Sequence, residues 1–247
     1  MNALHTQVFD CLDSTNLQAR RIAAAGKRDS TLIIARKQTA GRGRMGRSFY
    51  SPADTGLYMT LLCYPDAPLS ELTGLTCAAA WATALAIEEL SGATPTVKWV
   101  NDLYLHGRKI CGILCESVGT PHGTAVLVGI GVNLTTRDFP DEISGLAGSL
   151  QAEICPEALA ARICERLLQY VGHPDNALWL EDYRARFMLL GMPVTCILPT
   201  EQFDATVRGI SDGGALLVTD ALGRERELWA GELSIGATDP ASPFYKP

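Results

Sequence analysis

Residues 31–47 read Thr31-Leu-Ile-Ile-Ala-Arg-Lys-Gln-Thr-Ala-Gly-Arg-Gly-Arg-Met-Gly-Arg47. The apolar run at 31–35 predicts a strand, and the last seven residues hold three glycines and three arginines. Glycine allows positive φ and close approach of a ligand, and arginine offers a planar charged fork to carboxylate or phosphate. We therefore expect a strand that opens into a loop for anionic small molecules. A mobile basic surface loop is the alternative, and the phosphate-binding pattern G-x-x-x-x-G-K-[ST] is absent.

A second dense segment, residues 98–116, reads KWVNDLYLHGRKICGILCE. It predicts short strands at 97–99, 103–105 and 110–115, with a turn at 106–107. Charges among strand residues are costly to bury unless they are paired or bind a ligand. Asn101 and Asp102 offer oxygens suited to Mg²⁺, and Lys98 and Lys109 could meet phosphate. An edge hairpin whose charges face water is the alternative.

A third piece, Gly129-Ile-Gly-Val-Asn133, closes an apolar strand at 125–128. Glycines inside a strand indicate a bulge, or a close approach of backbone or ligand, although plain packing is the simpler explanation.

The order and spacing of the three pieces resemble biotin protein ligases of the biotin–[acetyl-CoA-carboxylase] ligase type. The matching motifs are GRGRMGR at 41–47, KWVND at 98–102, RK at 108–109, GILCE at 112–116 and GIGVN at 129–133. The resemblance extends from Asp10 to about Ile235. Val100 departs from the proline usual in the family, and Met45 stands where some members have another arginine.

The resemblance implies a two-step reaction: biotin and ATP form biotinyl-5′-AMP, and a lysine of a biotin carboxyl carrier domain then takes the biotin. It implies catalytic roles for Lys109, Arg44 and Asp102, with Asp102 also a possible Mg²⁺ ligand. The implied biotin-binding residues are Ser14, Thr15, Asn16, Gln38, Gly41, Arg42, Arg44, Lys109 and Gly112. The implied ATP-binding residues are Arg42, Arg44, Arg47, Phe49, Asn101, Lys109 and Asn133.

Two other functions stay open. A lipoate or octanoate protein ligase shares the catalytic fold, and a biotin- or nucleotide-binding sensor would lack the chemistry. The glycine–arginine loop and a C-terminal β module favour biotin, and the retained Lys109, Asp102 and arginines favour an enzyme.

Composition narrows the function classes. The 247 residues carry a net charge of −6, with 47% hydrophobic residues, which is typical of a globular protein and disfavours general nucleic-acid binding. No apolar window is long enough for a membrane span, and no signal peptide precedes Asp10, so we expect a cytoplasmic protein. The eight cysteines show no zinc or redox spacing, and Cys111 and Cys115 near the site are expected to serve packing. The protein is expected to be a monomer or a homodimer.

The order of the elements predicts the fold class. A helix is expected to begin at residues 13–16, where Ser14 and Thr15 stand, and to end before Gly26. Their hydroxyls cap this helix, or line the biotin pocket as the family implies, and the two roles can coexist. Further helices are expected at 70–91, 156–171 and 175–190, and short strands follow Gly191. We therefore expect an α/β (α+β) catalytic domain at 1–190 with a mixed, largely antiparallel sheet. The resemblance implies that this is the fold shared with class II aminoacyl-tRNA synthetases, that an SH3-like barrel occupies 191–237, and that 238–247 form a tail.

Overall fold

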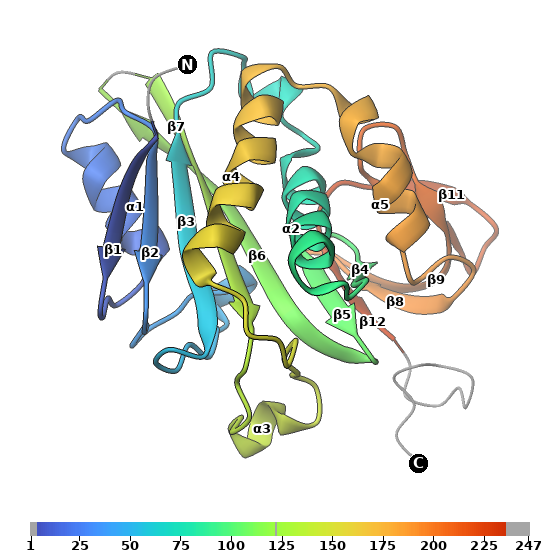
Figure 1. Ribbon diagram of the computed structural model, residues 1–247. Coiled ribbons are helices and arrows are strands. Elements are labelled where there is room, and N and C mark those ends of the chain that lie inside the picture. The colour runs from blue at the N-terminus through green and yellow to red at the C-terminus, as the bar shows by residue number, and fades with distance from the viewer. Residues whose placement is uncertain (1–3, 122, 236–247) are drawn as a thin grey trace.

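The computed structural model describes residues 4–121 and 123–235. The predicted tail at 238–247 and the last two residues of the predicted barrel lie outside these ranges. The described chain builds a large sheet with helices on both faces and a smaller sheet beside it (Figure 1). No helix in these two ranges is long and apolar enough to cross a membrane.

The large sheet has seven strands in the order β1-β2-β3-β7-β6-β5-β4. β1 and β2 are parallel and every other neighbouring pair is antiparallel, so the predicted mixed, largely antiparallel sheet is confirmed. The strands are β1 (His5–Phe9), β2 (Thr31–Ala35), β3 (Gly56–Cys63), β4 (Thr96–Lys98), β5 (Asp102–Leu105), β6 (Arg108–Thr120) and β7 (Gly123–Asn133).

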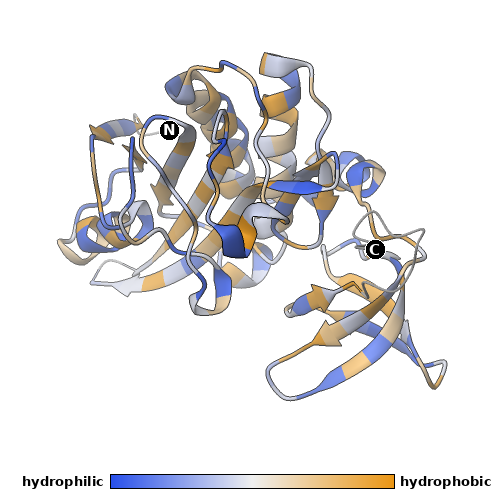
Figure 2. Ribbon diagram, turned by 90° about the horizontal axis from the view of Figure 1, so that it is seen from below, coloured by the Kyte–Doolittle hydropathy of each residue, from blue (hydrophilic) through white to orange (hydrophobic). Residues whose placement is uncertain are grey.

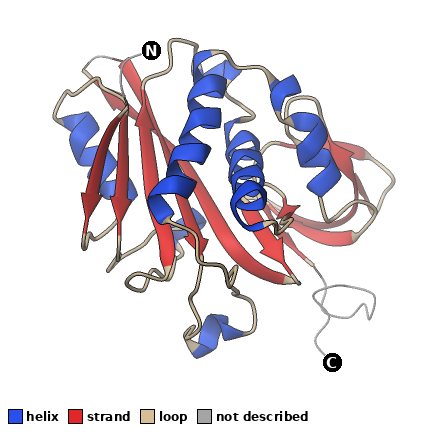
Figure 3. Cartoon of the chain, viewed as in Figure 1, coloured by secondary structure: helices blue, strands red, loops and turns tan. Residues whose placement is uncertain are grey.

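The two faces of this sheet carry different helices. α2 (Leu75–Ser91) and α4 (Pro156–Gly172) pack on one face, with α5 (Leu180–Arg186) beside α2 (Figures 1 and 3). α1 (Thr15–Ala24) packs on the opposite face over a smaller apolar cluster. This smaller cluster leaves room on the α1 face, and the candidate site lies there.

The alanine-rich face of α2 allows this helix to pack closely against the sheet. Several of its alanines are fully buried, so the helix packs without large side chains between it and its neighbours. The helix begins at Leu75, after a 3₁₀ turn at Leu69–Glu71, rather than at residue 70 as predicted. It ends at Gly92, whose φ of 74° is the left-handed conformation that glycine adopts freely.

The helix predicted at 175–190 is interrupted. The structure instead has a 3₁₀ turn at Asn176–Leu178, then α5, and the chain is extended at Phe187. Phe187 bridges to Val97 of β4, and the N–H of Met188 donates to the Val97 carbonyl at 3.1 Å. Pairing with the sheet edge therefore ends the helix early, which helical periodicity alone does not reveal.

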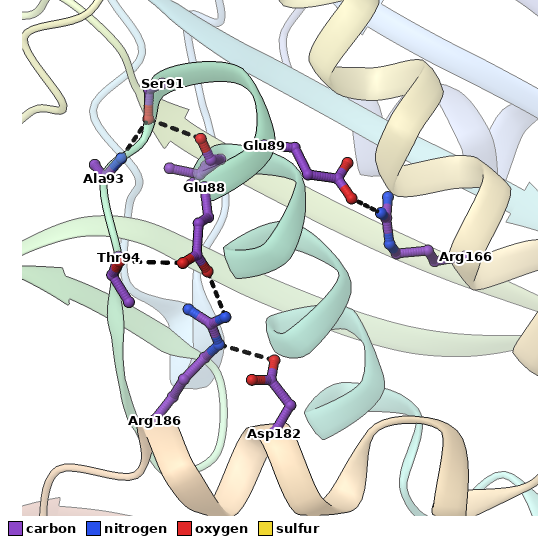
Figure 4. A network of polar contacts seen from close by, with 9 residues as sticks. Glu88, Glu89, Ser91, Ala93, Thr94, Arg166, Asp182 and Arg186 are labelled. Carbon is purple, nitrogen blue, oxygen red and sulfur yellow. Dashed lines mark hydrogen bonds and ion pairs between the residues drawn. The ribbon is translucent and has the colours of Figure 1, made fainter.

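Figure 4 shows the polar contacts that join α2, α4 and α5. Arg186, whose side chain is 9% exposed, pairs with Asp182 on α5 at 2.8 Å and with Glu88 on α2 at 2.5 Å. Arg166 of α4 pairs with Glu89 of α2. The three helices thus share ion pairs at the C-terminal end of α2.

The smaller sheet is antiparallel, with strand order β11-β10-β9-β8-β12. Its apolar and polar residues alternate along the strands, as Figure 2 shows. This sheet fits the predicted SH3-like module; the division of the chain at residue 190 stays a prediction. The last two strands of this sheet are separated by Gly231, which has a φ of 136°. The strands are β8 (Pro193–Ile197), β9 (Gln202–Ile210), β10 (Leu216–Asp220), β11 (Glu225–Leu228) and β12 (Glu232–Ser234).

One carbonyl of the β9–β10 turn makes two of the contacts that join the smaller sheet to the rest of the chain. The Gly214 oxygen accepts from the indole Nε1 of Trp99 at 3.0 Å and from the Cys77 thiol at 3.5 Å. Trp99 follows β4, and its peptide bond with Val100 is cis. These contacts therefore lie beside the segment that carries Asn101 and Asp102.

Candidate active site

The candidate site is a hollow on the α1 face of the large sheet. Alternate residues of a strand share a face, and Ala125 and Leu127 of β7 pack beneath α1. The next two positions on that face are Gly129 and Gly131, and Gly112 of β6 pairs with Gly131. All three glycines line the pocket, so missing side chains make its floor.

Phe49 lies over two of these glycines. A Cβ on Gly131 would come within 2.4 Å of the Phe49 ring, and one on Gly112 within 3.2 Å of the ring and 3.3 Å of Lys109 Nζ. The glycine pair therefore makes room for Phe49 and Lys109. Whether a ligand also rests on Gly112 stays a prediction.

The glycine–arginine loop folds back as a small hairpin. The Phe49 N–H donates to the Gly41 carbonyl at 2.9 Å, and the Gly43 N–H donates to the Arg47 carbonyl at 2.8 Å. Met45 and Gly46 form the tip, with φ of 53° and 76°. The Met45 side chain is exposed, so this departure from the family pattern lies outside the pocket.

Two loop arginines are held by other segments. Arg44 donates through Nη1 to Asn101 Oδ1 at 3.0 Å and through Nη2 to the Gly231 carbonyl at 2.9 Å. Arg47 pairs with Glu232 at the start of β12. The loop thus contacts both the KWVND segment and the smaller sheet.

Arg42 differs from the other two arginines. It lines the pocket, and within the described ranges its side chain makes no hydrogen bond or ion pair. A guanidinium in this position is available to a carboxylate or phosphate.

Lys109 and Asp102 form an ion pair at the pocket wall. Lys109 Nζ lies 2.7 Å from Asp102 Oδ1, although the geometry is not that of a directed hydrogen bond. Asn101 is fixed beside them by its Nδ2, which donates to the Ile113 carbonyl at 3.0 Å. The three residues predicted from KWVND and RK therefore meet in one place.

Lys98 adds a further cation. Burial, the largest cause, lowers the pKa of its amine, and the nearby Lys109 and Arg47 lower it further. Asp102 and Glu232 oppose this shift. The amine therefore holds its proton less firmly than an exposed lysine, and an anionic ligand would favour the protonated form.

Neutral polar side chains also line the pocket. Ser14 is 2% exposed and occupies the N-cap position of α1 with extended φ and ψ, yet its hydroxyl makes no capping hydrogen bond. Thr15 is buried beside it, and the Thr15 N–H donates to Gln38 Oε1 at 2.8 Å. Ser14 therefore occupies the cap position but does not cap the helix with its side chain, and its hydroxyl is available to a ligand.

Two predicted site residues lie behind the pocket wall. A Cβ on Gly41 would lie 2.4 Å from the Phe49 carbonyl and 2.8 Å from Ser51 Oγ, so this glycine permits close backbone packing. Asn133 is buried and donates to the Gly148 carbonyl at 2.9 Å, while its Oδ1 has no partner among the described residues.

All the other predicted site residues line the pocket. Several lining residues were not predicted as site residues, although Lys98 and the glycines stood in the quoted motifs. Gly231 and Glu232 carry no local signal, because only the folding of the smaller sheet brings them to the loop. The additional residues that matter here are Lys98, Gly129, Gly131, Gly231 and Glu232.

The donor set for a metal ion is small. No group of three or more His, Cys, Asp or Glu side chains that could hold a metal occurs in residues 4–121 or 123–235. Asp102 is the one predicted ligand, and it is already paired with Lys109. This arrangement fits an Mg²⁺ ion that is carried by ATP phosphates and takes at most one protein carboxylate.

The cysteines near the site are packing residues. Cys111 is fully buried, and burial, the largest cause, raises the pKa of its thiol. Burial likewise raises the pKa of Cys115 to about 11. Neither thiol is a nucleophile near neutral pH.

Known proteins share this fold and site-bearing region. Residues 8–133 match the Biotin/lipoate A/B protein ligase family. A biotin–[acetyl-CoA-carboxylase] ligase of Paracoccus denitrificans is 35% identical over 230 residues, covering 86% of this chain and 93% of that protein. The bifunctional ligase/repressor BirA of Bacillus subtilis is 32% identical over 246 residues, covering 94% of this chain and 74% of that protein.

Solved structures agree. The Aquifex aeolicus biotin protein ligase in complex with biotin and ATP superposes with a TM-score of 0.77 at 26% identity. The match covers 93% of this chain and 97% of that one. The likeness therefore extends over both sheets.

Proposed function

The chain belongs to the Biotin/lipoate A/B protein ligase family, and on this premise we propose that it is an ATP-dependent biotin–protein ligase. It forms biotinyl-5′-AMP and transfers biotin to a lysine of a biotin carboxyl carrier domain. The observation that carries the proposal is one pocket lined both by neutral hydrogen-bonding side chains, Ser14, Thr15 and Gln38, and by the cations Arg42 and Lys109. These two kinds of group match a cyclic urea at one end of biotin and a carboxylate at the other.

The first step joins two anions. A carboxylate oxygen of biotin attacks the α-phosphorus of ATP, and the bond to pyrophosphate breaks. Lys109 and Arg42 reduce the repulsion between the carboxylate and the phosphate, and Arg44 holds the developing charge. Because both nucleophiles come from substrates, the protein needs no nucleophile of its own.

In the second step the acceptor lysine attacks the acyl carbon. An amide forms, and AMP leaves with the electron pair of the broken anhydride bond. The lysine amine must lose a proton before or during attack, and the Asp102 carboxylate is suited to orient it. The Lys109–Asp102 ion pair supports this role, since it holds the Asp102 carboxylate beside Lys109, the proposed contact of the biotin carboxylate.

ATP is proposed to lie beside the cations of the pocket. Asn133, whose Oδ1 is unpaired among the described residues, is the proposed contact for the adenine amino group, although its side chain does not line the pocket in the free protein. The Phe49 ring offers a stacking face, and Arg47 and Asn101, which also line the pocket, would contact the phosphates. Mg²⁺ would enter with ATP and supply charge neutralisation of the phosphates, with Asp102 as its protein contact.

The acceptor and its setting are part of the proposal. The acceptor would be the carrier domain of an acetyl-CoA carboxylase, in the cytoplasm, where biotin-dependent carboxylation and reduced thiols are found together. The eight cysteines, all free in the structure, support such a setting. Monomer and homodimer both stay open.

Lipoate is the second candidate substrate. Its dithiolane ring has no hydrogen-bonding groups to match Ser14, Thr15 and Gln38, so it would make none of the bonds that a cyclic urea makes with them. Biotin-dependent exchange of pyrophosphate into ATP tests the choice, with lipoate as control. Biotin should support exchange and lipoate should not. Exchange with lipoate alone would overturn the proposal, and binding of biotin without any exchange would indicate a sensor.

A further inference from the structure

A chain of hydrogen bonds leads from the pocket to a carboxylate on β6. Asn16 Nδ2 donates to Glu116 Oε2 at 2.9 Å, and Asn16 Oδ1 lies 2.6 Å from the Thr60 hydroxyl. Thr60 Oγ1 lies 2.9 Å from Thr15 Oγ1, which is 3.2 Å from Gln38 Oε1. We name this chain the relay; it ends at two oxygens in the candidate site.

Two acceptors of the Asn16 NH₂ group set the direction of the bonds in the relay: the Glu116 carboxylate at 2.9 Å and, at a longer 3.4 Å, the Leu114 carbonyl. Glu116 is ion-paired with Arg20 at 3.0 Å, and a carboxylate in such a pair only accepts. It therefore faces the NH₂ group of Asn16 and turns the Asn16 oxygen toward Thr60. Thr60 has one hydroxyl hydrogen and must donate it to Asn16.

The remaining hydrogens follow by counting. Because the Thr60 hydrogen is used on Asn16, its contact with Thr15 requires the Thr15 hydroxyl to donate. Thr15 then has no hydrogen for Gln38 Oε1, which accepts instead from the Thr15 backbone N–H at 2.8 Å. Two acceptors, Thr15 Oγ1 and Gln38 Oε1, thus stand side by side with no hydrogen between them.

The packing holds the relay in place. A Cβ on Gly129 would lie 2.0 Å from Asn16 Oδ1, so the amide rests directly on the backbone of β7. Thr60 is fully buried, and Asn16 is 4% exposed. Water therefore cannot substitute freely for a misdirected bond.

We propose that Glu116 is a positioning residue for the substrate. Through Asn16 and Thr60 it sets the relay so that Thr15 and Gln38 together present acceptors to a ring N–H. This rests on the proposed function, because biotin carries such an N–H in its cyclic urea. A merely structural role, in which Glu116 ties α1 to β6 through Arg20, is the competing explanation.

Glu116→Gln separates the two explanations. The amide oxygen of the new residue faces the Arg20 guanidinium, so its NH₂ faces Asn16. Asn16 then turns over and gives up its 3.4 Å contact with the Leu114 carbonyl. Thr60 donates to Thr15, and Thr15 donates to Gln38. The acceptor pair is lost without removal of any atom from the pocket.

A second change restores the direction. In the double variant Asn16→Asp with Glu116→Gln, the NH₂ of the new glutamine donates to the new aspartate, whose other oxygen accepts from Thr60. Thr15 donates to Thr60 again. Asn16→Asp alone places two carboxylates together. It should therefore raise the KM for biotin more than Glu116→Gln or the double variant does.

The experiment measures KM for biotin, KM for ATP and kcat in pyrophosphate exchange, with a melting temperature for each variant. We expect Glu116→Gln to raise the KM for biotin on the order of tenfold, as loss of one hydrogen bond does, with KM for ATP and kcat within about twofold. The double variant, which also alters the pocket residue Asn16, should have a lower KM for biotin than Glu116→Gln has. The matched control Arg20→Gln removes the ion pair, keeps the acceptor and should change this KM less than about twofold.

Two results would overturn the proposal: a double variant no better than Glu116→Gln, or an Arg20→Gln effect as large as that of Glu116→Gln. Wild-type protein without biotin-dependent exchange would refute the proposed function instead. Active wild type with unaffected variants would refute the relay alone.

Discussion

Lys109 shows how far residue identity and spacing can lead. The RK pair at 108–109 and KWVND predicted that Lys109 and Asp102 serve one site, and the 2.7 Å ion pair brings them together. Position in the motif could not reveal that Gly112 makes room for the Lys109 side chain, since residues 109 and 112 face opposite sides of a regular strand and only the register shift between β5 and β6 changes this. The role of Lys109 in catalysis stays a prediction with a direct test.

Lys109→Ala should block formation of biotinyl-5′-AMP while the fold survives. The loss of one positioned cation costs on the order of a hundredfold or more in rate, because the carboxylate and α-phosphate then repel each other. Pyrophosphate exchange measures the rate, and thermal melting checks the fold. Exchange near the wild-type rate in the folded variant would refute this role.

Lys98 predicts a pH dependence for ATP binding. Burial lowers the pKa of Lys98, and bound phosphate raises it again by favouring the charged form. ATP binding therefore takes up a proton at alkaline pH, and affinity falls as pH rises through the lowered pKa. Arginine stays charged, so Lys98→Arg should flatten this decline in titrations of Kd against pH. If the affinity of Lys98→Arg for ATP fell with pH as that of wild type does, the pH dependence would belong to another group.

At the scale of elements, hydrophobic periodicity in the sequence predicted the helix α4 correctly but did not reveal the strand β3. α4 buries Leu159, Ile163 and Leu167 on one stripe, which gives the helix a clear signature. β3 is buried along its whole length, so it has no alternation, and the sequence analysis passed over it. The relay joins residues up to 100 positions apart, beyond the reach of any local pattern.

The glycine–arginine loop gives an element-scale prediction. Arg44 and Arg47 are held by Gly231 and Glu232, and an anion in the pocket would compete for the same arginines. Glu232→Gln should therefore speed tryptic cleavage at residues 42–47 in the free protein, and biotin with ATP should slow cleavage in both forms. Time courses of limited proteolysis, read by mass spectrometry, measure this. Equal cleavage with and without ligands would argue against closure of the loop over the substrates.

At the scale of the whole molecule, Gly214 makes one of the contacts between the smaller sheet and the rest of the chain. Its carbonyl accepts from Trp99, in the segment that carries Asn101 and Asp102. The sequence predicted both sheets, but this contact depends on tertiary packing. Trp99→Phe should lower the free energy of unfolding by about 1–3 kcal/mol, because the buried carbonyl loses its indole donor. Chemical denaturation measures the change, and no loss of stability would mean that the contact is dispensable.

Transfer of biotin to protein is the central claim, and intact-mass spectrometry of a biotin carboxyl carrier domain tests it most directly. The purified protein is incubated with the domain, ATP, Mg²⁺ and biotin, with lipoate in place of biotin as control and with an acceptor whose target lysine is arginine. We predict one biotin added to the wild-type domain, only with ATP, and none in either control. An unmodified domain in the complete mixture, or addition of lipoate in place of biotin, would contradict the account.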